Sequence, residues 1–268
     1  MVSEDRSYIP ELYGRRKGKP LKKRQAALLE TLLPRIAIPA PARASTGEPG
    51  EVFFPRAAGE VSPRSGDEGR APPLARAPRR SPTLDLAAFF PGKDEIHLEI
   101  GFGGGEHLAA QAAANRQAGF IGAETYLNGV AKLLVLIDDK KLDNIRIHHG
   151  DARPLIEALP DGSLCRAYVL FPDPWPKSRH YKRRIISPWF FGEATRLLRT
   201  SGILRVASDI GDYVRWTLMH AANAPQFEWT AERAADWSAR PPDWPPTRYE
   251  AKAIRDGRRP VYLQFRRR

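Results

Sequence analysis

Cysteine is almost absent from this chain of 268 residues, which holds one cysteine and two methionines. The single Cys165 excludes an internal disulfide, and its position inside an apolar run favours a buried, unreactive thiol. No apolar run approaches the length of a membrane-spanning helix, and residues 1–10 lack the apolar core of a signal peptide. The sequence therefore predicts a cytoplasmic protein that does not enter a membrane.

Clustered metal ligands are missing as well. The six histidines are scattered, and the adjacent pair His148 and His149 ends a predicted strand, so the two rings point to opposite faces of a sheet. No Cys–His spacing is typical of zinc. The sequence predicts no metal site.

Negative charge is also scarce, with 31 acidic against 43 basic residues and a net charge of +12. An excess of this size favours a nucleic-acid partner or an anionic surface. The length suits one large domain or two small ones and is enough to bury a substantial core.

Composition divides the chain into three parts. Residues 1–38 form a basic arm, in which a cationic run from Arg15 to Arg24 precedes an apolar segment of helical character. Residues 39–84 are rich in Pro, Ala and Arg and lack periodicity, a composition that cannot offset its ordering entropy, so a disordered linker is predicted. Residues 85–268 are predicted to form the folded domain, which carries any catalytic activity.

Strand and helix patterns alternate in residues 85–268. Strands are predicted at 96–100, 120–124, 145–148, 164–171, 203–208, 227–230 and 261–265. Helices are predicted at 106–114, 128–140, 154–159, 188–198 and 213–222, the fourth starting at a Ser187-Pro188 cap and ended by Gly202. Such alternation predicts an α/β fold with a doubly wound, mainly parallel sheet of about seven strands and helices on both faces.

A glycine-rich loop follows the first predicted strand and opens a helix. Its sequence, Glu99-Ile100-Gly101-Phe102-Gly103-Gly104-Gly105-Glu106, lacks the final glycine of a dinucleotide fingerprint. The acid-x-Gly-x-Gly-x-Gly pattern resembles the loop of class I methyltransferases, a Rossmann-like class that binds S-adenosylmethionine. An ordinary turn is the alternative.

Two more acids end the next strands. Glu124 ends the second strand, where a carboxylate accepts hydrogen bonds from both hydroxyls of a ribose. Asp151 follows the third strand and would lie beside an adenine. Asp151 alone fits an ordinary loop carboxylate equally well, and an exposed strand-end carboxylate is the alternative for Glu124, but with Glu99 they converge on one edge of the sheet.

The most distinctive stretch runs from Leu170 to Arg184. Three prolines stiffen Phe171-Pro172-Asp173-Pro174-Trp175-Pro176 and hold Asp173 at the carboxyl end of a strand, where open α/β sheets bind ligands. Six side chains that are cationic or become cationic on protonation follow within residues 177–184. A fixed carboxylate beside this basic loop predicts chemistry on a polyanion, and a solvated face is the alternative for the basic run.

Together these motifs resemble the bacterial tRNA (guanine-N7)-methyltransferase family, over roughly residues 90–268. Further matches are Ser208-Asp209, Arg240-Pro241 and the tetrapeptide Thr247-Arg248-Tyr249-Glu250. The family usually has Lys-Phe where this chain has Arg248-Tyr249, and commonly His where it has Pro176.

The resemblance implies methyl transfer from S-adenosylmethionine to N7 of the variable-loop guanine, position 46, of tRNA. We expect a monomer, although the sequence does not give the oligomeric state, and the need for an accessory subunit stays open. Asp173 would be the catalytic residue. The implied cofactor-binding residues are Glu99, Gly101, Gly103, Gly105, Glu124, Asp151 and Asp173. The implied nucleotide-binding residues are Lys177, Asp209, Thr247, Arg248, Tyr249 and Glu250. Arg179, Lys182, Arg183 and Arg184 would contact RNA phosphates, which makes binding salt-dependent.

Three alternatives stay open. Asp209 fits a helix cap as well as a substrate contact. The whole chain could be a catalytically inactive RNA-binding protein with a methyltransferase fold, although the cofactor motifs are intact. A methyltransferase of small molecules or proteins is disfavoured, because such substrates gain little from a dense cationic loop.

Overall fold

The computed structural model describes residues 18–39 and 83–268. Most of the predicted linker, 40–82, and the start of the basic arm lie outside the described residues. Two helices, α1 (Lys23–Thr31) and α2 (Leu33–Ile36), occupy the rest of the arm. Among the described residues, no helix is both long and apolar enough to span a membrane.

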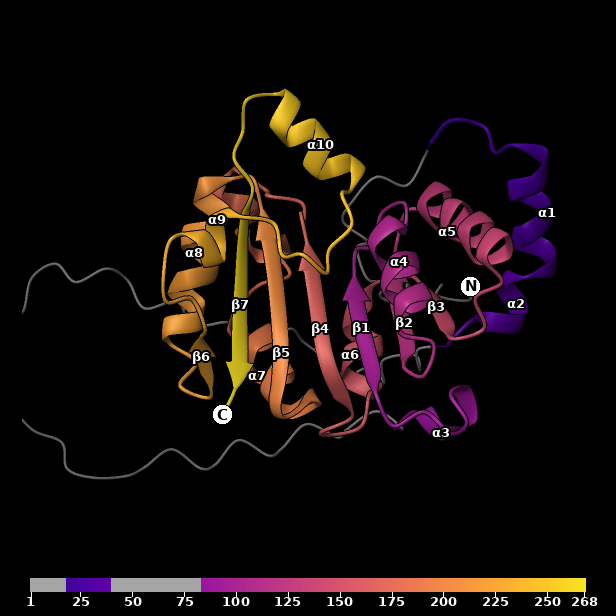
Figure 1. Cartoon of the computed structure of the whole chain (residues 1–268), viewed down its shortest axis with the longest axis horizontal. Helices are drawn as coiled ribbons and strands as arrows, with labels where there is room; N and C mark the ends of the chain where they lie inside the picture. Colours follow the sequence, from indigo (N-terminus) through magenta and orange to yellow (C-terminus); the bar gives the residue numbers. More distant parts are fainter. Residues whose placement is uncertain (1–17, 40–82) are drawn as a thin grey trace, which may run out of the picture.

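A seven-stranded sheet of order β3-β2-β1-β4-β5-β7-β6 forms the centre of the molecule (Figure 1). The strands are β1 (Ile96–Ile100), β2 (Gly119–Glu124), β3 (Ile145–His149), β4 (Leu164–Leu170), β5 (Leu198–Ser208), β6 (Phe227–Trp229) and β7 (Val261–Arg267). The first five strands are parallel, whereas β7 is antiparallel to both β5 and β6. The predicted doubly wound α/β class is confirmed.

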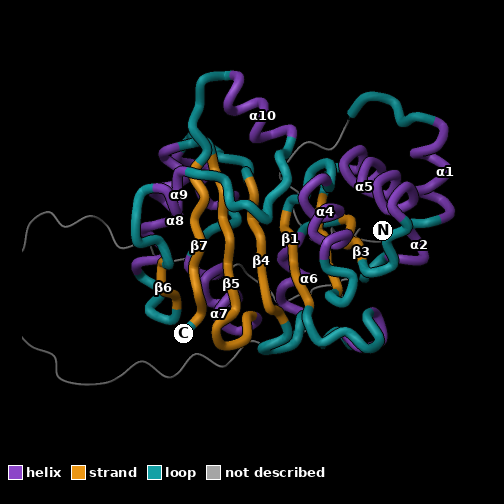
Figure 2. The backbone as a smooth tube through the Cα atoms, in the orientation of Figure 1, coloured by secondary structure: helices purple, strands orange, loops and turns teal. Residues whose placement is uncertain are grey.

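Helices cover both faces of the sheet (Figure 2). They are α3 (Leu86–Phe89), α4 (Glu106–Ala114), α5 (Leu127–Lys140), α6 (Ala152–Ala158), α7 (Pro188–Leu197), α8 (Gly211–Ala222), α9 (Ala235–Ser238) and α10 (Arg248–Arg255), with a 3-10 helix η1 (Ser178–Arg183). One core cluster joins α6, α7 and α8 to the sheet, and another joins α4 and α5 to it. The sequence predicted neither the short helices α3, α9 and η1 nor α10.

The predicted role of Gly202 is wrong. Helix α7 ends at Leu197, within one residue of its predicted end, but β5 begins directly at Leu198 and not at Ile203, so Gly202 does not end the helix. Gly202 lies inside β5, close to an irregularity in the register with β4 and next to Ser201, whose φ is +64°. A Cβ at Gly202 would lie 2.7 Å from the Arg199 carbonyl oxygen, so the glycine permits a tight bend within the strand.

The arm covers the edge strand β3. Ala37 bridges Ile147, and the backbone N–H of Ile38 donates to the Ile147 carbonyl at 2.9 Å. Arg24 on α1 pairs with Asp138 on α5 at 2.6 Å. Pairing of this kind protects an otherwise open sheet edge.

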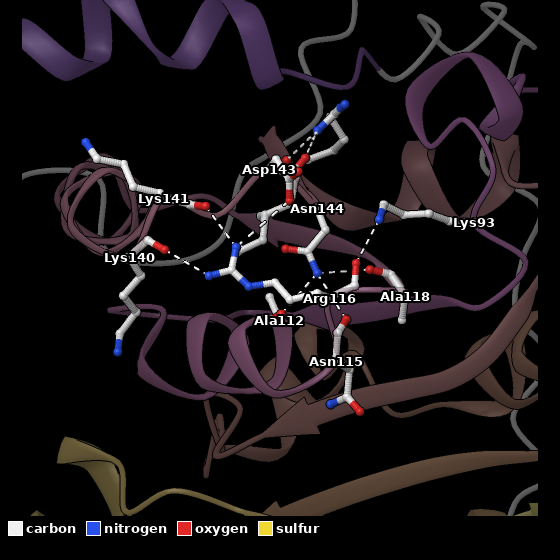
Figure 3. A network of polar contacts seen from close by, with 11 residues as sticks. Lys93, Ala112, Asn115, Arg116, Ala118, Lys140, Lys141, Asp143 and Asn144 are labelled. Atoms are coloured by element: carbon white, nitrogen blue, oxygen red, sulfur yellow. Dashed lines mark hydrogen bonds and ion pairs between the residues drawn. The ribbon is translucent and has the colours of Figure 1, made fainter.

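Polar contacts join the carboxyl ends of α4 and α5 (Figure 3). The Asn144 amide donates to the carbonyls of Ala112 and Ala118 at 3.0 Å each, and Arg116 donates to the Lys140 and Lys141 carbonyls at 3.0 and 2.8 Å. Both helices are therefore anchored at the end remote from the glycine loop, which fixes the position of their amino ends beside that loop.

The buried His97, on the interior strand β1, is expected to make the folded protein less stable in acid. Its side chain is buried against Phe120, and burial together with Arg166 and Arg199 lowers the pKa of His97 to about 3. The unfolded chain gains this proton below roughly pH 6.5, so the stability present above that pH is lost as the pH falls toward 3. We expect His97→Phe to reduce the drop in urea midpoint between pH 7 and pH 4.5.

A matched variant, His149→Gln at the exposed end of β3, should behave like the wild type. An identical pH dependence in His97→Phe and the wild type would show that another group is responsible.

The strand order places a crevice at the carboxyl ends of β1 and β4. From β1 the chain winds toward β2 and β3, whereas from β4 it winds toward β5. Open α/β sheets bind ligands at such a reversal of winding.

Candidate active site

A cavity of about 250 Å³ lies at this crevice. Its lining includes Gly101, Gly103, Glu124, Asp151, Asp173, Trp175, Arg183 and Tyr249. The structure thus brings together most of the residues that the sequence predicted for cofactor binding, from the ends of β1, β2, β3 and β4.

Left-handed backbone shapes the glycine loop. Gly101, Gly103 and Gly105 have φ values of +72°, +57° and +78°, a region that disfavours other residues. A Cβ at Gly105 would lie 2.6 Å from a Leu133 methyl, so glycine is also required by packing. At Gly101 the same atom would meet nothing within 4 Å, which leaves open space in the cavity beside the backbone.

Glu124 holds the loop and faces the cavity. Its carboxylate accepts from the backbone N–H groups of Gly103, Thr125 and Tyr126 at 2.7, 2.8 and 2.9 Å. Burial raises the pKa of Glu124, and these three N–H donors oppose the rise. Oε1 accepts from both Thr125 and Tyr126, whereas Oε2 accepts only from Gly103, so Oε2 keeps a lone pair that can accept from a ligand hydroxyl.

Asp173 lies at the mouth of the cavity on an irregular loop. The flanking residues Phe171 and Trp175 have φ values of +50° and +42°, uncommon for residues other than glycine. The protein around Asp173 raises the pKa of its carboxyl by partial desolvation. Within the described residues it has no hydrogen bond or ion pair, so its acceptors are available to a ligand.

Asp151 and Glu99 are more constrained. Asp151 caps α6 by accepting from the Arg153 backbone and pairs with the Arg153 guanidinium at 3.1 Å, yet it still lines the cavity. Glu99 is buried, accepts from His107 on α4 at 2.7 Å and does not line the cavity. The structure therefore supports a role for Glu99 in fixing α4 beneath the loop, and its predicted cofactor contact stays a prediction.

The predicted nucleotide-binding residues are only partly grouped. Tyr249 lines the cavity, and its ring lies close enough to Gly103 that a Cβ there would approach within 2.9 Å. Arg248 pairs with Glu106 beside the loop, whereas Asp209 pairs with Arg258 at 2.6 Å. Lys177 is exposed on the loop before η1.

Thr247 and Glu250 form a capping box at the start of α10. Glu250 is 3% exposed and also binds Arg240 and the Tyr262 hydroxyl. These contacts occupy its carboxylate, so in this structure it anchors α10 instead of facing the cavity. The Thr-x-x-Glu spacing is a signature of such a box and would have indicated this role from sequence.

The four residues predicted to contact RNA phosphates differ in how exposed their side chains are. Arg179 and Lys182 are exposed on η1, and Arg183 stacks on Trp175 with its guanidinium 4.9 Å from the ring centre. Arg184 requires a correction: its side chain is 1% exposed and pairs with Asp212, so it is not placed to meet an RNA phosphate.

Among the described residues, no group of three or more His, Cys, Asp or Glu side chains is arranged to hold a metal ion.

Comparison with known proteins identifies the family. Residues 93–263 match a family model described as "Putative methyltransferase". The chain is 49% identical to the tRNA (guanine-N(7)-)-methyltransferase of Rhodospirillum rubrum over 96% of its length and 87% of the relative's, and 44% identical to that of Rhizobium meliloti over 95% and 94%. The chain belongs to the tRNA (guanine-N(7)-)-methyltransferase family. The family predicted from the sequence motifs is confirmed.

A solved structure supports the fold of this methyltransferase. The 16S rRNA methyltransferase KamB aligns with a TM-score of 0.50 at 15% identity, covering 70% of this chain and 95% of that one. The likeness shows a shared fold and nothing more specific.

Proposed function

We propose that this methyltransferase transfers a methyl group from S-adenosylmethionine to N7 of the variable-loop guanine, position 46, of tRNA. The observation that carries the proposal is the cavity itself, in which the glycine loop, Glu124 and Asp173 meet beside the exposed cations of η1. Relatives that share 42–49% identity bear the name tRNA (guanine-N(7)-)-methyltransferase, which supports the atom and the substrate class.

The residues present fit S-adenosylmethionine. The open space at Gly101 accommodates a group against the backbone, and Oε2 of Glu124 offers an acceptor for a ribose hydroxyl. Asp151 lies where it would face an adenine, and the carboxylates complement a cation that carries no phosphate. When bound, the cofactor supplies an electrophilic methyl group on a sulfonium.

The protein's own residues have to position the base. Guanine N7 presents a lone pair and needs no deprotonation, so alignment and exclusion of water provide much of the rate. In this proposal Asp173 accepts from the N–H donors of guanine and stabilises the positive charge that develops on the ring. Tyr249, at the cavity wall, offers an aromatic face for a base turned out of its stack.

The test is transfer of labelled methyl groups to unmodified bulk tRNA, followed by borohydride and aniline cleavage at N7-methylguanine. Cleavage at one variable-loop guanine supports atom and substrate together. No labelling, with intact cofactor binding by calorimetry, would indicate another substrate. Loss of cofactor binding as well would favour the alternative, an inactive RNA-binding protein.

The exposed cations of η1 predict a salt-dependent contact. We expect the double variant Arg179→Ala with Lys182→Ala to weaken tRNA binding and to reduce the slope of log K against log salt by roughly one to two, because each phosphate contact adds about 0.7–0.9. Filter binding over a range of salt concentrations measures this slope.

The matched control is Lys93→Ala with Lys140→Ala, which removes the same charge far from the cavity. Equal slopes for both double variants would show that η1 is a solvated face and that only net charge matters.

A further inference from the structure

A buried arginine lies directly behind the loop that carries Asp173. The Arg184 side chain is 1% exposed, although it comes from the most cationic stretch of the chain. Burial of a charged side chain is costly unless the charge is paired and hydrogen-bonded. Its partners therefore indicate what the residue does.

Those partners are the loop and α8. The Nε of Arg184 donates to the Pro174 carbonyl at 2.8 Å, and an Nη donates to the Trp175 carbonyl at 3.4 Å. The same Nη donates to the Asp212 carboxylate at 2.6 Å. Arg184 thus joins the two residues that follow Asp173 to the first turn of α8.

Aromatic rings hold the guanidinium in place. Its carbon lies 3.9 Å from the ring centre of Tyr181, 4.9 Å from that of Trp216 and 5.3 Å from that of Tyr213. Such contacts favour a desolvated cation. A planar, pre-organised donor held on three sides can fix a backbone segment more rigidly than a flexible ammonium.

The loop needs support of this kind. Trp175 has a positive φ, which costs energy for a residue other than glycine, and Pro172, Pro174 and Pro176 have no N–H with which to hold the segment by backbone hydrogen bonds. Carbonyl acceptors remain available, and Arg184 binds two of them.

We propose that Arg184, held by Asp212, is a positioning residue that fixes the backbone of Pro174 and Trp175 and thereby the place of the Asp173 carboxylate. The inference rests on the proposed function for the role of Asp173. Arg184 itself touches neither substrate nor cofactor in this account.

Arg184→Met is expected to lower kcat by roughly 10- to 100-fold, since a displacement of about 1 Å at a reacting group has effects of that order. The KM for tRNA and the Kd of the cofactor should change far less. Loss of a phosphate contact would instead raise the KM for tRNA. Arg184→Lys should fall between the wild type and Arg184→Met, because one ammonium cannot reproduce the planar fork.

Arg196 provides a matched control. It is another largely buried arginine that binds the carbonyls of Ile156 and Leu159 and the carboxylate of Glu193, at the opposite end of the sheet. Arg196→Met should lower the melting temperature like Arg184→Met but leave kcat unchanged below the transition. Equal losses of kcat in both variants would overturn the proposal in favour of general destabilisation.

Hydrogen exchange separates this inference from the proposed function. The amides of Phe171 and His180, which donate to the Ala207 and Lys177 carbonyls at the two ends of this loop, should exchange faster in Arg184→Met than in the wild type or Arg196→Met, whether or not tRNA is the substrate. If Arg184→Met does not fold, Asp212→Asn provides the same test, because it is a milder change at a half-exposed site. It should raise the same exchange rates. Unchanged exchange in Asp212→Asn and in any folded Arg184 variant would refute the positioning role.

Discussion

Replacement of Asp173 by alanine is expected to lower kcat for methyl transfer by roughly 100-fold or more, the usual cost of removing one pre-organised electrostatic partner. Asp173 has no partner among the described residues, so its loss leaves the fold intact. Transfer of labelled methyl groups under single-turnover conditions measures the effect. Binding of tRNA, measured separately, should change little, and an unaltered rate would remove Asp173 from the mechanism.

The same carboxyl should control the acid side of the pH profile. Partial desolvation raises the pKa of Asp173, so the ionised form is lost as the pH falls through that raised value. The fall in kcat should therefore occur above the ordinary aspartate value of roughly 3.9. Asp173→Asn should lack this limb, whereas an unchanged limb in the variant would assign it to another group.

Glu124→Ala is expected to raise the Kd of the cofactor by roughly 100-fold. A hydrogen bond to a charged group contributes about 1.5–3 kcal/mol, and Oε2 of Glu124 keeps a lone pair for a ribose hydroxyl. The variant also releases the Gly103 N–H, which loosens the glycine loop. Calorimetry with S-adenosylhomocysteine measures the change without dependence on turnover.

Two companions make that result specific. Glu228→Ala removes an exposed carboxylate on the edge strand β6 and should bind like the wild type. Glu124→Gln keeps one acceptor oxygen but loses the charge, and its Kd should fall between those of Glu228→Ala and Glu124→Ala. A wild-type Kd in Glu124→Ala would place the ribose elsewhere in the cavity.

The sequence predicted those parts of the site whose geometry depends on residues close together in the chain. Glycines with positive φ, an acid at the end of β2 and prolines around Asp173 all act through residues close to them in the chain. Parallel strands then bring these short segments to one edge of the sheet, because their carboxyl ends coincide. For this reason Glu124, Asp151 and Asp173 line one cavity, as predicted.

The roles of paired side chains could not be predicted in the same way. In the sequence, Lys182, Arg183 and Arg184 are three equivalent cations. Arg184 is buried because it contacts Asp212 and Trp216, which are distant in the chain. Asp209 likewise meets Arg258, 49 residues away. Such pairings depend on how α8 and α10 are placed by the complete sheet.

The position of β7 has a consequence for the order of folding. β6 precedes β7 in the chain, yet its only neighbour in the described sheet is β7, which itself lies against β5. During synthesis, β6 therefore cannot pair with the sheet until β7 has been made, and contacts between residues far apart in sequence form slowly. The connection between them carries Thr247–Glu250 and α10, so a nascent chain can complete its first five strands before the wall around Tyr249 exists.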